Sequence, residues 1–123
     1  MEAKKEKLVY LCTHGPENPE KATLPVSMAL GAMAMDMEAV VILQADGVLL
    51  AKKGVSSHVI PAGMTSFEEQ FNFFLEDGGV VVACTACLSA RKIGKEMLDE
   101  RIELGSVARL AKECSEARNI VCY

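Results

Sequence analysis

Two cysteines, Cys84 and Cys87, have the spacing and the setting for thiol chemistry. Cys84 directly follows the apolar run GVVVA (residues 79–83), which is typical of a buried strand, and the segment LSARKIGKEML after Cys87 can form a helix or helical turn. A thiol at a strand-to-helix junction faces unpaired backbone N–H groups, and Arg91 and Lys92 add positive charge nearby. Both influences favour the thiolate, which is the nucleophilic form of cysteine.

Two other predicted strands end in polar residues that belong beside this pair. One strand ends in the sequence CTHG and the other is followed by an Asp-Gly turn. In open parallel sheets, ligands bind beyond the carboxyl ends of the strands, so we expect these ends to shape a pocket around the cysteines. The predicted substrate-binding residues are Cys12, Thr13, His14, Asp46, Gly47 and Arg91, and the predicted catalytic residues are Cys84 and Cys87.

We predict neither a metal nor a cofactor. A zinc site made of Cys84, Cys87, Cys12 and His14 has suitable ligand types but lacks a second closely spaced pair. The glycines form no G-x-G-x-x-G or Walker pattern, so the sequence does not predict a nucleotide site. His14 and Asp46 also have structural interpretations, as a surface histidine and as a turn residue.

The elements that must position these residues alternate between strand and helix patterns. Near-continuous β-branched runs predict strands at 7–12, 39–44, 79–83 and 119–122, which suits a sheet covered on both faces. Apolar residues at helical spacing predict helices over 67–75, with a capping box at Ser66, and over 107–114. Repeated β–α units indicate an α/β fold with an open, mostly parallel sheet and helices on both faces.

The first predicted helix differs from the others. Asn18 and Pro19 are suited to a cap and a first turn, and Pro25 is expected to limit or kink the helix. The stretch Leu24–Met37 is apolar on almost every side, so it should be buried on every side. In so small a domain we expect one face to pack on the sheet and the other on a second subunit, although a buried helix in a monomer is the alternative.

Composition limits the class of protein. A length of 123 residues fits one domain, residues 1–123, and the net charge of −4 argues against a nucleic-acid surface. No apolar run approaches the roughly 20 residues of a membrane-spanning helix, and no signal peptide is evident. The odd number of cysteines, five, fits reduced thiols in the cytoplasm, with Cys114 and Cys122 expected to be buried.

From Cys84 onward the chain resembles a known family. The segment CTACLSARKIGKEMLDERIELG (residues 84–105) is similar to the DsrE/DsrF-like pattern of a strand-end cysteine, a basic residue, an Arg-Gly-Ile element and a closing Glu-hydrophobic-Gly. THGPENPEKA, ADGVLLAKKGV and ARNIVCY resemble further segments of that family, in the same order. Two positions depart from the family pattern, because Lys92 replaces the usual glycine and Cys87 adds a second thiol.

The resemblance implies a five-stranded, mostly parallel sheet, assembly into a homotrimer or hexamer, and sulfur carried as a persulfide on Cys84. Sulfur donor and acceptor proteins, or small sulfur anions, are the implied partners. We therefore expect a cytoplasmic sulfur carrier or sulfurtransferase-like protein in which Cys87 resolves the persulfide and Arg91 favours anionic donors. Two alternatives remain: a thiol–disulfide oxidoreductase that uses Cys84 and Cys87, and a non-catalytic oligomeric binding module.

Overall fold

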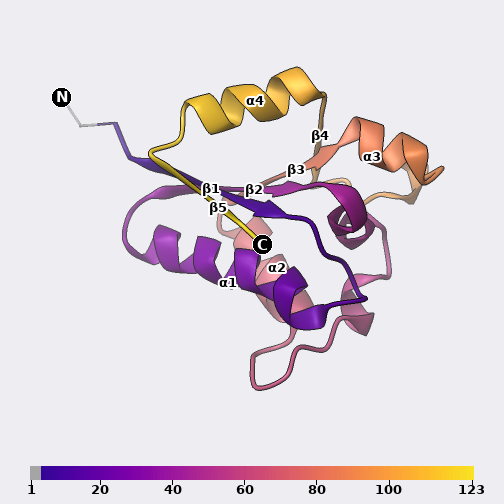
Figure 1. The fold of residues 1–123 in the computed structure, drawn as a ribbon. Helices are drawn as coiled ribbons and strands as arrows, with labels where there is room; N and C mark the ends of the chain where they lie inside the picture. The colour runs from indigo at the N-terminus through magenta and orange to yellow at the C-terminus, as the bar shows by residue number, and fades with distance from the viewer. Residues whose placement is uncertain (1–3) are drawn as a thin grey trace.

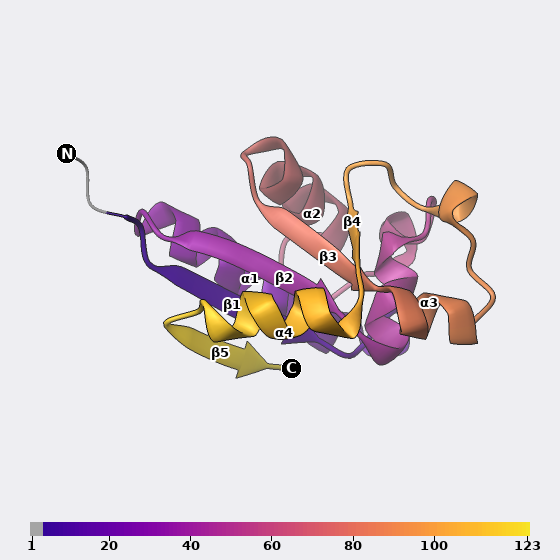
Figure 2. The ribbon, with the colours of Figure 1, turned by 90° about the horizontal axis from the view of Figure 1, so that it is seen from above.

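Five parallel strands form one sheet at the centre of the protein, which we describe from a computed structural model that covers residues 4–123. The spatial order of the strands is β4-β3-β2-β1-β5, so three successive connections step in one direction and the last returns to the far edge (Figure 2). The strands are β1 (Lys7–Cys12), β2 (Glu38–Leu43), β3 (Val80–Cys84), β4 (Glu103–Gly105) and β5 (Asn119–Cys122).

The helices cover both faces of this sheet. Figure 1 shows α1 (Pro19–Ala34) and α2 (Phe67–Glu76) beneath the sheet and α4 (Val107–Ser115) above it. The short α3 (Thr85–Ala90) and the 3-10 helix η1 (Ala45–Ala51) lie beyond the carboxyl ends of the strands (Figure 2). Two further 3-10 turns, η2 (Ser56–His58) and η3 (Lys95–Met97), lie in the connections. The predicted α/β fold, a parallel sheet with helices on both faces, is confirmed.

The sequence pattern locates the predicted strands to within one residue and misses β4. Three central strands are apolar along almost their whole length because helices cover both sides, as the continuous Val and Ile runs indicated. β4 has only three residues, two of them exposed, and its sequence Glu-Leu-Gly has no period that marks a strand. Only its pairing with β3 makes it a strand.

Helix α1 corrects two expectations. It runs through Pro25 without ending, and it stops at Ala34 rather than Met37. One face is not fully buried in the single chain, since Met28 within the helix is 45% exposed and Met35, the C-cap residue, is 72% exposed. The other face packs on the sheet and on α2 through small residues such as Ala22, Ala29 and Ala32.

Capping residues agree with the sequence. The Asn18 side chain accepts a hydrogen bond from the Lys21 backbone N–H at the start of α1, and Ser66 accepts one from Glu69 at the start of α2. Among residues 4–123, no helix is both long and apolar enough to cross a bilayer.

Candidate functional site

The predicted cysteine pair lies at the junction of β3 and α3. Cys84 is the last residue of the strand and the N-cap of the helix, and Cys87 is the third helical residue. Side chains at the N-cap and at the third helical position lie next to each other, as they do in a capping box. The C-x-x-C spacing therefore brings the two thiols together at the carboxyl edge of the sheet.

The two thiols differ in their access to solvent. Cys84 is buried, with 3% of its surface exposed, whereas Cys87 is half-buried. The backbone N–H of Ala45 donates a hydrogen bond to Cys87 Sγ at 3.3 Å. Burial raises the pKa of Cys87 and the Cys84 side chain adds to that effect, while the Ala45 N–H and the Arg91 guanidinium act to lower it.

Arg91 connects α3 to the turn after β2. Its Nη2 and Nε atoms donate to one carboxylate oxygen of Asp46, at 2.9 and 3.1 Å, and its Nη1 donates to the Cys87 carbonyl at 3.2 Å. The Asp46 and Arg91 side chains are partly exposed, so the pair contributes mainly geometry rather than stability. Because Asp46 directly follows Ala45, this ion pair keeps the Ala45 backbone N–H close to the Cys87 sulfur.

Two glycines allow the β1 and β2 loops to approach each other closely. A Cβ atom on Gly47 would lie 2.1 Å from the Cys12 carbonyl oxygen, and one on Gly15 would lie 2.5 Å from the Asp46 carbonyl oxygen. No side chain fits either place. The missing side chain of Gly47 therefore lets the Asp46 turn pack on β1.

Thr13 and His14, the two residues after β1, form hydrogen bonds that hold the loop after this strand. The Thr13 hydroxyl donates to the Tyr123 carbonyl at 2.6 Å, which attaches the β1 loop to the residue after β5. His14 Nδ1 lies 2.9 Å from Glu17 Oε2. Glu17 also accepts the Gly15 backbone N–H at 2.6 Å, so it orders the whole loop.

Sequence reasoning missed two participants, Ala45 and Glu17. The Ala45 contribution is a backbone N–H, which every residue type except proline carries, so no sequence signal reveals it. Its backbone also has φ of +50°, a left-handed conformation that alanine rarely adopts. Glu17 is visible in the sequence only as a polar loop residue.

Cys12 is not part of the thiol cluster, contrary to the sequence-based expectation. It is completely buried, and its Sγ donates to the His14 carbonyl at 3.3 Å and points toward the Ala22 carbonyl of α1. Side chains alternate along strands, and the register of the sheet puts Cys12 on the α1 face and Cys84 on the α4 face. Burial raises the pKa of Cys12 to about 12.

The two remaining cysteines also differ from expectation. Cys122 lies exposed on the edge strand β5, and Cys114 is half-buried on α4, where burial raises its pKa. No three metal-ligating side chains come together within residues 4–123. The four-ligand zinc site is therefore not assembled, since Cys12 lies on the other face of the sheet.

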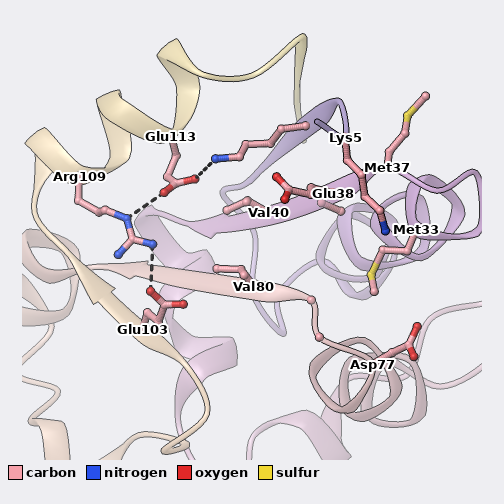
Figure 3. A pocket seen from close by; sticks show the side chains of 14 residues that line it. Lys5, Met33, Met37, Glu38, Val40, Asp77, Val80, Glu103, Arg109 and Glu113 are labelled. Carbon is pink, nitrogen blue, oxygen red and sulfur yellow. Dashed lines mark hydrogen bonds and ion pairs between the residues drawn. The ribbon is translucent and has the colours of Figure 1, made fainter. Parts of the chain in front are cut away.

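A cavity lies at the opposite edge, around the amino ends of β2 and β3. Its volume is about 350 Å³, and it lies between α4, the end of α1 and the loop before β3. Figure 3 shows Arg109 between Glu113 and Glu103, with which it forms ion pairs of 3.0 and 2.9 Å. None of the predicted site residues lines this cavity.

Two sequence relatives cover nearly the whole chain. The uncharacterized protein MK0008 of Methanopyrus kandleri is 28% identical over 116 residues, which are 94% of this chain and 93% of the relative. The uncharacterized protein MJ0989 of Methanocaldococcus jannaschii is 28% identical over 117 residues, 95% of this chain and 99% of the relative.

Solved structures show the same fold. The ychN protein from E. coli superposes with a TM-score of 0.75 at 18% identity and covers 96% of this chain and 99% of its own. MTH1491 from Methanobacterium thermoautotrophicum, a protein of unknown function, gives 0.72 at 14% identity, covering 98% and 100%. The sequence model described as the DsrE/DsrF-like family matches residues 6–123.

Proposed function

Because the chain belongs to the DsrE/DsrF-like family, we propose that it is a sulfur carrier that holds sulfur as a persulfide on Cys84. Family membership suggests a function in sulfur relay. The observation that supports the finer proposal is the position of Cys84, the last residue of β3, at the carboxyl edge of the sheet beside a second thiol. A carrier of this kind needs a compartment where thiols stay reduced, such as the cytoplasm.

The proposed chemistry is an exchange between thiols and persulfides. The Cys84 thiolate attacks the outer sulfur of a donor R–S–SH, a new S–S bond forms on Cys84, and the donor's S–S bond breaks to release R–SH. An acceptor thiolate then attacks the outer sulfur on Cys84 and removes it. The transferred sulfur keeps its oxidation state in both steps, so no separate oxidant is required.

The neighbouring side chains support this chemistry in defined ways. Arg91 places a fixed positive charge beside the pair, which favours an anionic persulfide as donor and as product. Asp46 holds Arg91 in place, and Gly47 allows the turn that carries Asp46 to pack on β1. Thr13 and His14 order the adjoining loop through Tyr123 and Glu17.

Intact mass spectrometry tests the proposal. After exposure to inorganic polysulfide, the wild-type protein should gain one sulfur atom, and peptide mapping should locate it on Cys84. Cys84→Ser should abolish this gain at that position. Cys12→Ser is the matched control, because Cys12 also ends a strand but lies on the other face, and its loading should equal that of the wild type. A wild-type protein whose added sulfur maps to a residue other than Cys84 would disprove the assignment.

A second function has support from the same geometry. Cys84 and Cys87 are adjacent at the start of α3, an arrangement that also suits a reversible disulfide. A thiol–disulfide oxidoreductase would form that disulfide under mild oxidation, lose two hydrogens in mass, and reduce insulin catalytically. A protein that takes up sulfur but does not reduce insulin is a carrier and not an oxidoreductase.

A further inference from the structure

We propose that Cys87, and not Cys84, makes the first contact with the sulfur donor and then passes the sulfur inward to Cys84. The inference rests on the proposed function and adds an order of events to it. It follows from the unequal exposure of the two thiols, the groups that surround Cys87, and the adjacency of the pair.

Access to the surface separates the two thiols. Cys84 is 3% exposed and follows three strand residues that are themselves fully or almost fully buried. In-line attack on a persulfide requires the donor's S–S bond to point directly at the attacking sulfur. A persulfide on a protein side chain cannot bring its outer sulfur to a buried atom, whereas it can reach the half-buried Cys87.

Burial raises the pKa of Cys87 above that of an ordinary thiol, and two groups around its sulfur act in the opposite direction. The Ala45 backbone N–H donates to Cys87 Sγ at 3.3 Å, and the left-handed backbone of Ala45 fixes that direction. Arg91, the C-cap residue of the same helix, follows Cys87 by one turn; its Nη1 donates to the Cys87 carbonyl, and its side chain is 31% exposed. A donor that carries an anionic persulfide therefore meets the guanidinium of the Arg91–Asp46 ion pair at the entrance and a hydrogen-bond donor at the receiving thiol.

The two transfers conserve atoms and electrons. The Cys87 thiolate attacks the outer sulfur of R–S–SH, a Cys87–sulfur bond forms, and the donor's S–S bond breaks to give R–SH with the proton released by Cys87. The Cys84 thiolate next attacks the outer sulfur on Cys87. A persulfide forms on Cys84 while the Cys87 thiol is regenerated with the proton from Cys84. Cys87 thus stands between the surface and the buried thiol.

The size of the donor decides whether Cys87 is needed. A small inorganic polysulfide ion needs far less room than a folded protein, so we expect its loading of Cys84 not to depend on Cys87. A persulfide on a folded protein depends on the exposed thiol. We therefore infer that the donor class for this site is a protein persulfide.

The experiment compares two donors on three proteins. Serum albumin that carries a persulfide on its free cysteine serves as the large donor, and inorganic polysulfide serves as the small one. Cys87→Ser should slow loading of Cys84 from albumin persulfide at least tenfold, while loading from polysulfide stays within twofold. Cys122→Ser, which removes an exposed thiol outside the site, should match the wild type with both donors.

Rapid quenching gives an independent readout. In the wild type, peptide mapping at short times should find the sulfur on Cys87, and later on Cys84. In Cys84→Ser, albumin persulfide should load Cys87 at the wild-type rate, and the sulfur should stay there. Cys87→Ala, checked by circular dichroism for native folding, repeats the test without a hydroxyl.

Failure of the relay differs from failure of the proposed function. If Cys87→Ser and Cys87→Ala load from albumin persulfide at the wild-type rate, donors reach Cys84 directly and the relay is wrong. A longer-lived Cys84 persulfide in those same variants would then assign Cys87 to resolving the persulfide. If no donor loads Cys84 in the wild type, the carrier function itself is wrong.

Discussion

At the scale of single residues, the burial of Cys12 predicts how protein stability depends on pH, independently of any sulfur transfer. It is completely buried, and burial raises its pKa to about 12, from about 9 for an ordinary thiol. Between pH 9 and about 12, the Cys12 thiol is ionised in the unfolded chain and stays protonated in the native protein. The native state then binds more protons than the unfolded state, so stability falls as pH rises, by up to about 1.4 kcal/mol per pH unit.

We predict that Cys12→Ala removes this part of the alkaline destabilisation. The variant should lose about 1 to 2 kcal/mol of unfolding free energy at pH 7 through lost packing. Between pH 9 and about 12, its unfolding free energy should fall less steeply than that of the wild type. Urea denaturation across this range measures both slopes, and parallel slopes would show that Cys12 ionises equally in the two states.

At the scale of elements, three helices end in the same way. In each, the backbone N–H groups of the first and second residues after the C-cap donate to carbonyl groups in the last helical turn, which is the Schellman arrangement. The residue in the left-handed position is Asp36 after α1, Gly78 after α2 and Lys92 after α3. Lys92 therefore adopts the left-handed conformation that glycine usually takes at this position, and α3 ends in the same kind of turn as α2, where the residue is Gly78.

We predict opposite effects of two substitutions at these positions. Lys92→Gly relieves a left-handed lysine (φ +55°) and should raise the unfolding free energy by about 0.5 to 1 kcal/mol. Gly78→Ala introduces the same strain (φ +93°) and should lower it by about 1 kcal/mol. No atom lies within 4 Å of the added Cβ at Gly78, so its effect isolates backbone conformation. Equal signs in chemical denaturation would contradict this account.

Helix α4 is held to the sheet by a chain of ion pairs centred on Glu113. Lys7 Nζ of β1 lies 3.0 Å from Glu113 Oε1, and Arg109 Nε lies 3.0 Å from Glu113 Oε2. Burial alone would raise the pKa of Glu113, but the hydrogen bonds from Lys7 and Arg109 outweigh it and lower the pKa below that of an ordinary glutamate. The stabilisation is therefore present above about pH 4.5 and is lost as pH falls through the lowered pKa.

We predict that Glu113→Gln lowers the unfolding free energy by about 1 to 3 kcal/mol near pH 7, because Lys7 and Arg109 each lose the less exposed of their two ion-pair partners and keep only Glu116 and Glu103. The difference from the wild type should shrink below pH 4.5. Glu116→Gln is the matched control, since Glu116 bonds the same Lys7 at 3.2 Å but is 43% exposed, and it should cost less than about 1 kcal/mol. Equal losses from both variants would mean that burial does not strengthen the Glu113 contact.

At the scale of the whole molecule, homo-oligomerisation stays a prediction. Met28 on α1 and Met35, the C-cap residue of that helix, are exposed apolar side chains available to a second subunit. We expect light scattering at micromolar concentration to give a mass at least three times that of one chain. Met28→Lys with Met35→Lys should reduce this mass, whereas Val107→Lys, 68% exposed on the opposite face, should not. A monomer throughout that concentration range would disprove the assembly.

The sequence by itself determined the positions of most strands and helices. The β-branched runs located four strands because parallel strands covered on both faces must be apolar throughout, and the polar caps located the helix starts because a helix leaves its first N–H groups unpaired. The position of Cys84 after such a run fixed it at the carboxyl edge. The C-x-x-C spacing at a helix start was enough to bring Cys87 beside it.

Only the tertiary structure decided which groups meet. Cys12 and Cys84 both end strands, but the sheet register puts them on opposite faces, and a one-residue difference in register would reverse that. The contacts of Arg91 with Asp46 and of the Ala45 N–H with Cys87 join segments more than forty residues apart. The exposure of Cys122 depends on β5 forming an edge of the sheet. Local patterns report how each residue is buried by its own element, whereas contacts across the sheet depend on the order and register in which the strands assemble.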